Sequence, residues 1–127
     1  MINKPVIAVD FDGTITKHIG HLHIGEPVPD AIRVIKRLIR EKEAKIILHT
    51  MRGGRQERDA VGYLAKNGIV PFGVNQNPLQ PGSDYRHSRK IWADIYIDDS
   101  AVGCPLIYEE GSRPFVDWLE VEKMLFT

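Results

Sequence analysis

The chain has 127 residues, of which 43% are hydrophobic and 27% are charged, and 17 basic residues balance 17 acidic ones. This length and composition are typical of one globular domain, which we expect to span residues 1–127. The length leaves no room for a second domain. Because the net charge is zero, no overall field attracts the chain to nucleic acid or to anionic lipid, and we expect neither as a partner.

The sequence also indicates a cellular compartment. Cys104 is the single cysteine, so no disulfide can form within the chain. The charged start of the sequence lacks the apolar core of a signal peptide, and apolar runs such as Val6–Val9 are far shorter than the ~18 residues that span a bilayer. We therefore predict a soluble, cytoplasmic protein.

The first half of the chain alternates between strand and helix patterns. Residues 5–10 form a short, continuously apolar and β-branched run, which is typical of a strand buried on both faces of a parallel sheet. Residues 30–43 have the apolar spacing of an amphipathic helix, and residues 45–50 repeat the strand pattern. A second helix is predicted over residues 55–67.

The second half continues this alternation, with a turn-rich loop over residues 76–85. The pattern predicts strands over residues 69–74, 93–97 and 106–108, a short helical piece over 86–91, and a closing helix over 113–126.

Such an alternation predicts an α/β fold, namely a doubly wound, Rossmann-like parallel sheet of about five strands with helices on both faces. Ligands of these sheets bind at the carboxyl ends of the strands, so residues at those ends are the first functional candidates. These positions hold Asp10, Thr50, Asn75 and Asp98.

Two pairs of carboxylates follow predicted strands, with Asp10 and Asp12 after the first strand and Asp98 and Asp99 after the fourth. A single aspartate at a strand end is often only a turn former, but that explanation is poor for four. If the pairs converge, their like charges raise some of the carboxyl pKa values unless a divalent cation relieves the repulsion. Oxygen ligands of this kind suit Mg²⁺, which we expect these four residues to hold.

These residues resemble the motifs of the haloacid dehalogenase-like (HAD) superfamily of phosphohydrolases. The first motif, D-x-D-G-T-[I/L/V], is matched by residues 10–15, the Thr or Ser that ends the next strand by Thr50, and the late acidic pair by Asp98-Asp99. The third motif, a Lys or Arg ahead of the late pair, is assigned to Lys90, with Arg89 as the alternative.

The resemblance covers the whole core and is to a capless or minimal-cap type. Residues 16–29 stand where the family inserts its first cap domain, but they are too few for a domain and suit a small flap or hairpin. The resulting open site leaves room for a second copy of the chain. We therefore expect a homo-oligomer as one possibility, in which a second copy covers the site.

The resemblance implies a Mg²⁺-dependent phosphatase that hydrolyses a phosphomonoester through an aspartyl-phosphate. Asp10 is then the nucleophile, and Asp12 protonates the leaving oxygen and afterwards activates the hydrolytic water. Thr50 donates a hydrogen bond to a phosphoryl oxygen, and Lys90 offsets the negative charge. The implied metal ligands are Asp10, the backbone carbonyl of Asp12, Asp98 and, through water or an orienting contact, Asp99.

Other residues are candidates for binding the substrate, which we expect to be a small phosphorylated metabolite such as a sugar phosphate. The backbone amides after Asp10 can donate to phosphate, histidines lie in the flap, and arginines follow Thr50. Solvated loop histidines and helix-surface arginines are the ordinary alternatives. The candidates are Phe11 through its amide, His21, His23, Arg52 and Arg55.

Three other classes of function share parts of this pattern. A phosphotransferase, or a non-catalytic phosphate-binding or signalling relative of the same fold, stays open as an alternative. A receiver domain is disfavoured, because its phosphorylated aspartate ends the third strand, whereas the predicted third strand leads into Asn75.

Overall fold

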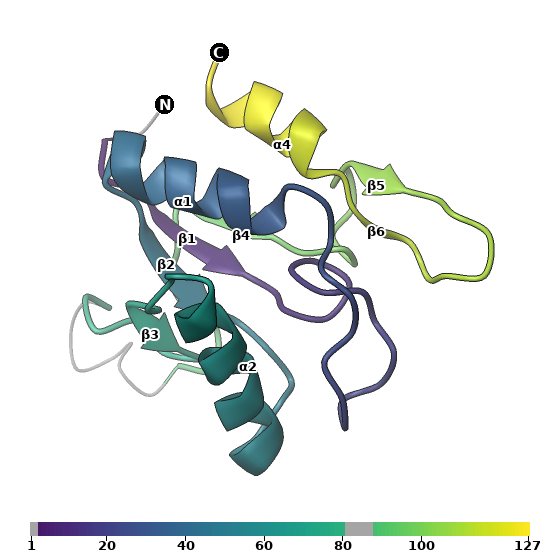
Figure 1. Ribbon diagram of the computed structural model, residues 1–127. Helices are drawn as coiled ribbons and strands as arrows, with labels where there is room; N and C mark the ends of the chain where they lie inside the picture. The colour runs from purple at the N-terminus through teal and green to yellow at the C-terminus, as the bar shows by residue number, and fades with distance from the viewer. Residues whose placement is uncertain (1–2, 81–87) are drawn as a thin grey trace.

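The computed structural model describes residues 3–80 and 88–127 and is built around a parallel sheet (Figure 1). Within these residues the sheet has four strands in the order β3-β2-β1-β4, with neighbouring strands parallel. At the carboxyl end of β1, Val9 pairs with Leu48 of β2 and Ile97 of β4, so these three strands end at one edge of the sheet. The strands are β1 (Val6–Val9), β2 (Lys45–Leu48), β3 (Gly73–Val74) and β4 (Ile95–Ile97).

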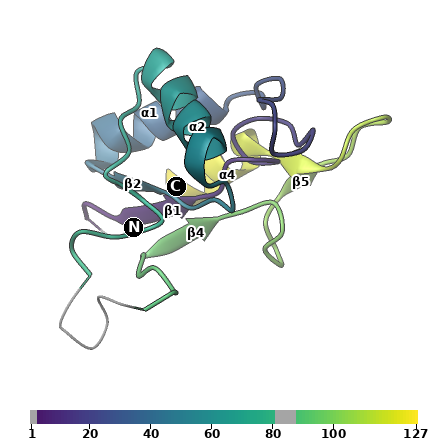
Figure 2. The ribbon, with the colours of Figure 1, turned by 90° about the horizontal axis from the view of Figure 1, so that it is seen from below.

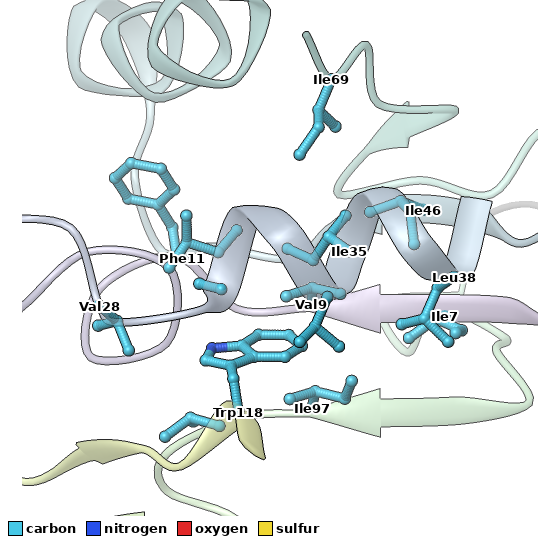
Figure 3. Packing of buried hydrophobic residues seen from close by; sticks show 14 of the residues in the cluster. Ile7, Val9, Phe11, Val28, Ile35, Leu38, Ile46, Ile69, Ile97 and Trp118 are labelled. Atoms are coloured by element: carbon cyan, nitrogen blue, oxygen red, sulfur yellow. The ribbon is translucent and has the colours of Figure 1, made fainter. Parts of the chain in front are cut away.

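The described helices pack on one face of this sheet (Figures 1 and 2). They are α1 (Ala31–Lys42), which connects β1 to β2, α2 (Gly54–Lys66), which connects β2 to β3, and α4 (Trp118–Leu125). Their buried side chains join one hydrophobic cluster with Ile7 and Val9 of β1 (Figure 3). Burying each large apolar side chain stabilises the fold by about 1.5–3 kcal/mol, so this cluster fixes the sheet under the helices.

The opposite face of the sheet carries Val6, Ala8 and Ile47, which pack against Ile91 and the partly buried Ala93. Residues 3–80 and 88–127 place no helix over this face, so the prediction of helices on both faces is not met there. Among the helices of these ranges, none combines the length and the apolar character that crossing a bilayer requires.

The sheet has four strands within the described residues, and the prediction of about five was wrong for a structural reason. Residues 106–108 were expected to join the main sheet, but β5 (Leu106–Ile107) pairs antiparallel with β6 (Phe115–Val116) in a separate two-stranded sheet. The closing helix therefore begins at Trp118 and not at residue 113. Asp117 caps its N-terminus by accepting a hydrogen bond from the backbone N–H of Glu120.

Two further elements are shorter than predicted. Only Gly73–Val74 of the predicted strand 69–74 pairs with β2. Pro71 lies within this stretch and has no N–H to donate to a ladder, which shortens the strand. Residues 88–91 are not helical, and the remainder of the predicted helical piece, residues 86–87, lies outside the described residues, as does part of the predicted loop 76–85.

The segment between β1 and α1 closes on itself at its base. The backbone N–H of Lys17 donates to the carbonyl of Glu26 at 2.7 Å, and that of Val28 donates to the carbonyl of Ile15 at 2.9 Å. These bonds hold the two ends of the segment side by side, so residues 17–26 project as a loop. We call this segment the 17–26 loop; it contains the three histidines of the predicted flap, His18, His21 and His23.

Candidate functional site

Three of the four predicted metal-binding residues bring their carboxylates together at the carboxyl edge of the sheet. Asp10 follows β1, and Asp98 and Asp99 follow β4, its parallel neighbour. Each of the three residues offers a carboxylate oxygen, and these oxygens lie within 4.8 Å of one another. We call these residues the acidic cluster; Asp12, the fourth predicted ligand, was expected to contribute its backbone carbonyl, and its side chain lies outside the cluster.

The acidic cluster holds more negative charge than its surroundings favour. The pKa of Asp10 is raised to about 8, first because burial disfavours the charged form, then through a hydrogen bond with Asp99 and the negative charges of Asp98 and Asp99. A divalent cation among these oxygens would offset the repulsion, and carboxylate oxygens are the ligands that Mg²⁺ prefers. The donor set therefore fits a Mg²⁺ ion.

Gly13 allows the acidic cluster to be this tight. Its φ angle is +82°, a left-handed conformation, and a Cβ atom at this position would lie 2.4 Å from Oδ2 of Asp99. Next to it, Oγ1 of Thr14 lies 3.2 Å from Oδ2 of Asp10 and accepts a hydrogen bond from the backbone N–H of Asp99 at 3.3 Å. Gly13 and Thr14 thus join the loop after β1 to the loop after β4.

The same loop is held in place by residues far along the chain. The indole N–H of Trp118 donates to the carbonyl of Thr14 at 2.7 Å, across 104 positions of sequence. The backbone N–H of Val116 donates to the carbonyl of Gly13 at 3.0 Å. Because both Trp118 and Val116 are buried, β6 and the start of α4 form a rigid support for the acidic cluster.

Thr50 lies in the loop after β2, and Asn75, which follows β3, holds its backbone in place. The backbone N–H of Thr50 donates to Oδ1 of Asn75 at 2.9 Å, and Nδ2 of Asn75 donates to the carbonyl of Thr50 at 2.8 Å. Oγ1 of Thr50 accepts a hydrogen bond from the backbone N–H of Arg52 at 3.0 Å, which leaves its own hydrogen free to be donated. Thr50 can therefore donate to a bound anion.

Two cavities meet at the acidic cluster and share Asp10, Thr50, Met51 and Asp98. The first, of about 310 Å³, is also lined by His49, Asn75, Arg89 and Ile91. The second, of about 420 Å³, is also lined by Asp12, His18, His21, Asp99, Ser100 and Arg113.

Asp12 pairs with Arg52 instead of joining the acidic cluster. Nε of Arg52 donates to one carboxylate oxygen of Asp12 and Nη2 donates to the other, both at 2.8 Å, and Nη2 also donates to the carbonyl of His23 at 2.7 Å. The side chain of Arg52 is fully buried and that of Asp12 is 6% exposed. Arg52, predicted as a substrate-binding residue, therefore points at Asp12 and not into the open cavity.

Arg89, and not Lys90, borders the smaller cavity. Arg89 lines the smaller cavity, whereas Lys90, the first choice from the sequence, lines neither cavity and is exposed. Among the described residues, Arg89 makes no ion pair.

The other predicted substrate-binding residues are divided between the site and its surroundings. His21 lines the larger cavity, where its Nε2 lies 3.8 Å from Oδ2 of Asp12 and its ring contacts that of His18. His23 contributes its carbonyl to Arg52, and Arg55 is exposed at the first turn of α2, outside both cavities. The side chain of Phe11 is fully buried, so only its backbone can serve the site.

Sequence reasoning missed several residues of the site, and each had only a partial signal. Thr14 lies inside the first motif and could have been chosen by position. Asn75 was a candidate from its place after a predicted strand, but no role was assigned to it. Arg113 was placed at the start of the closing helix, and only the pairing of β5 with β6 brings it to the larger cavity. Ser100 follows the late acidic pair and lines the same cavity.

Comparisons with known proteins give one strong likeness. No model of a protein family matches the sequence, and a search of curated proteins finds no match. Among solved structures, the chain is similar to that of a conserved protein coded by a locus of Bacteroides thetaiotaomicron, with 32% sequence identity and a TM-score of 0.75. The similarity covers 97% of this chain and 90% of that one. On this identity and coverage, the chain belongs to the same family as the conserved Bacteroides thetaiotaomicron protein.

Proposed function

We propose that this protein is a Mg²⁺-dependent phosphatase of the HAD type, which hydrolyses a phosphomonoester through an aspartyl-phosphate on Asp10. The observation that carries the proposal is the arrangement of Asp10, the late acidic pair and Thr50 around two joined cavities at one edge of a parallel sheet. The D-x-D-G-T order of residues 10–14 supports the same reaction class.

The proposal includes a Rossmann-like, doubly wound fold. The strand order β3-β2-β1-β4, with α1 and α2 as crossovers between parallel strands, supports it. In such a sheet the order reverses beside the first strand, between β1 and β4, which is where Asp10 and Asp98 face each other. A cytoplasmic location belongs to the same proposal and is supported by the single cysteine, Cys104.

In this reaction, Asp98 and Asp99 would hold Mg²⁺ together with Asp10 and the backbone carbonyl of Asp12. When bound, the ion supplies positive charge that offsets the charge of the phosphoryl oxygens.

The residues of the chain supply the remaining chemistry in two steps. First, a carboxylate oxygen of Asp10 forms a bond to phosphorus while the bond to the leaving oxygen breaks, and Asp12 gives that oxygen a proton. Next, water loses a proton to Asp12 and attacks phosphorus, which breaks the bond to Asp10 and releases inorganic phosphate. Thr50 donates a hydrogen bond to a phosphoryl oxygen, and Arg89 supplies the positive charge assigned at first to Lys90.

The two cavities suggest how the substrate lies. Asp10, Thr50 and Arg89 border the smaller cavity, which suits the phosphoryl group. Asp12 and His21 border the larger cavity, which suits the leaving group because the proton donor is there. Imidazole and hydroxyl groups in the larger cavity match the hydroxyls of a small phosphorylated metabolite such as a sugar phosphate.

The hydrolysis of p-nitrophenyl phosphate tests the proposal. After removal of metal with EDTA, we expect turnover only when Mg²⁺ is added back, and we expect a phosphorylated protein in acid-quenched samples by mass spectrometry. Asp10→Asn should lose activity by a factor of about 10³ or more, because the nucleophile is removed. Asp59→Asn, which changes an exposed aspartate of α2, should stay within about twofold of the parent. Parental activity in Asp10→Asn would refute the proposal.

A further inference from the structure

Arg52 connects three segments that lie far apart in the sequence. It follows Thr50 in the loop after β2, its guanidinium holds both carboxylate oxygens of Asp12 in the loop after β1, and Nη2 reaches the carbonyl of His23 in the 17–26 loop. These are its three short side-chain contacts, each between 2.7 and 2.8 Å. Arg52 therefore stands between the predicted proton donor and the loop that borders the leaving-group cavity.

The pair of Arg52 and Asp12 is too deeply buried to be a surface ion pair. With no exposed side-chain area on Arg52 and 6% on Asp12, the guanidinium depends on Asp12 for two of its hydrogen bonds. The two parallel hydrogen bonds fix the plane of the carboxylate as well as its position. A lysine at position 52 could keep the charge but not this two-point geometry, because its ammonium is a single point donor.

This geometry leaves Asp12 free on its cavity side. Each carboxylate oxygen has two lone pairs, and Arg52 occupies one on each oxygen. Asp12 still lines the larger cavity, where His21 Nε2 lies 3.8 Å from Oδ2. The face of the carboxyl that remains available is thus the face towards the space assigned to the leaving group.

We propose that Arg52 is a positioning residue, which aims the carboxyl of Asp12 at the leaving oxygen and ties the 17–26 loop to that carboxyl through the carbonyl of His23. This inference rests on the proposed phosphatase function. Arg52 touches neither the substrate nor the metal in this scheme, and it acts on the reaction only through Asp12.

The choice of leaving group separates this role from general support of the fold. An alkoxide leaves poorly without a proton, whereas p-nitrophenolate leaves readily without one, so a misaimed Asp12 matters most for an alkyl ester. We therefore compare kcat/KM for glycerol phosphate and for p-nitrophenyl phosphate in the parent and in Arg52→Lys. The expected loss is about 30- to 100-fold for glycerol phosphate and below about fivefold for p-nitrophenyl phosphate.

The matched control is Arg58→Lys, the same substitution at an exposed position of α2, which should leave both values unchanged. A second variant, Arg52→Gln, should show the same selective loss. Equal losses on both esters, or no loss on either, would overturn the inference. So would thermal melts in which neither variant at position 52 folds, because Arg52 would then be a structural residue.

The two proposals fail in different ways. If the parent hydrolyses neither ester with Mg²⁺, the phosphatase proposal is refuted, whatever Arg52 does. The tie to the 17–26 loop is then still measured by amide hydrogen exchange, which should be faster in residues 17–26 of Arg52→Lys than in the parent and unchanged in Arg58→Lys. Unchanged exchange in Arg52→Lys would refute the tie.

Discussion

The two sides of the candidate site are built in different ways. On the acidic side, the loop after β1 is mostly buried and receives hydrogen bonds from Trp118 and Val116. On the cationic side, Arg89 stands on an exposed stretch before β4, which is attached to the second face of the sheet mainly through the buried Ile91. Tyr96 assists there by donating its hydroxyl hydrogen to the carbonyl of Ile91.

This difference fits what each side has to do in the proposed reaction. Mg²⁺ demands nearly ideal geometry at short range, so its ligands need a rigid support. A flexible cation on an exposed segment can instead adjust to phosphate groups on different substrates. The comparison predicts that substitutions on the acidic side lower stability and activity more than substitutions on the cationic side.

The largest effect should come from Gly13→Ala, which disturbs the loop that carries the acidic cluster. The new Cβ meets the carboxylate of Asp99 at a left-handed backbone position, so we expect a loss of about 2–4 kcal/mol in the free energy of unfolding. Because Asp99 must move, the apparent dissociation constant for Mg²⁺ should rise about 10- to 100-fold. Urea denaturation and the Mg²⁺ dependence of the hydrolysis rate measure the two effects.

Gly111→Ala is the control for backbone strain. Gly111 has a φ of +80°, close to that of Gly13, but a Cβ there meets no atom of the described residues within 4 Å. We expect a cost of about 1–2 kcal/mol in stability and unchanged Mg²⁺ dependence. If both alanine variants weaken Mg²⁺ binding equally, the close approach of Gly13 to Asp99 is not what shapes the acidic cluster.

Arg89→Ala should have the next largest effect and tests the cationic side. Removal of Arg89, which lines the smaller cavity, should lower kcat/KM for p-nitrophenyl phosphate about 10- to 30-fold. Lys90→Ala should lower it by less than about threefold, because Lys90 borders neither cavity. A larger loss of kcat/KM in Lys90→Ala than in Arg89→Ala would show that Lys90, as first assigned from the sequence, offsets the charge of the phosphate.

Trp118→Phe sharpens the comparison by removing one hydrogen bond that supports the acidic side while an aromatic ring stays in the core. A six-membered aromatic ring is retained, but the hydrogen bond to the carbonyl of Thr14 is lost, which leaves a buried acceptor unpaired and should cost about 1–3 kcal/mol. The smaller ring also fills less of the core, which adds to this cost. Thermal melts measure this cost. Trp92→Phe, at a half-exposed position on the other side, should leave the melting temperature nearly unchanged. Equal shifts in the two variants would contradict the predicted difference between the sides.

The smallest effect should come from Glu122→Gln, which loosens α4 from α1. Hydrogen bonds from Arg33 and Arg37 lower the pKa of Glu122 to about 2, from an ordinary value of 4.5. As the pH falls, the carboxyl of Glu122 is therefore protonated first in the unfolded chain. The stabilisation of the fold by the Glu122 carboxylate is complete above about pH 4.5 and is lost as the pH falls through about 2.

Chemical denaturation as a function of pH measures this effect. Glu122→Gln should be less stable than the parent at pH 7, and the difference should vanish towards pH 2. Glu120→Gln, which loses only an ion pair within α4, is the control. A difference between Glu122→Gln and the parent that is constant with pH would show that the charge of Glu122 does not hold α4 in place.

The parts of the fold that the sequence predicts well are those with a strong local signal. Three strands of the parallel sheet and two crossover helices coincide with continuous apolar runs and amphipathic spacing. The convergence of Asp10 with the late acidic pair also followed from the sequence, because parallel strands end at one edge.

The missed features depend on contacts between distant residues. Phe115 and Val116 have apolar side chains that suit a helix as well as a strand, and only their pairing with β5 decides between the two. The partnership of Asp12 with Arg52 spans 40 positions. The position of Arg52 two residues after Thr50 marked it as a candidate for substrate binding, but nothing local indicates a buried pair with Asp12. That Arg89 and not Lys90 lines the smaller cavity depends on how an irregular segment turns, which residue periodicity does not record.

The hydrogen bond from Trp118 to Thr14 also bears on how the site is assembled. During synthesis, the loop that contains Asp10 is made 104 residues before its indole partner. The sheet can begin to form around β1 and β2 earlier, but the loop gains this support only after α4 has docked. We therefore expect nascent chains that stop before Trp118 to bind Mg²⁺ poorly, so that competence for the proposed reaction arises late in folding.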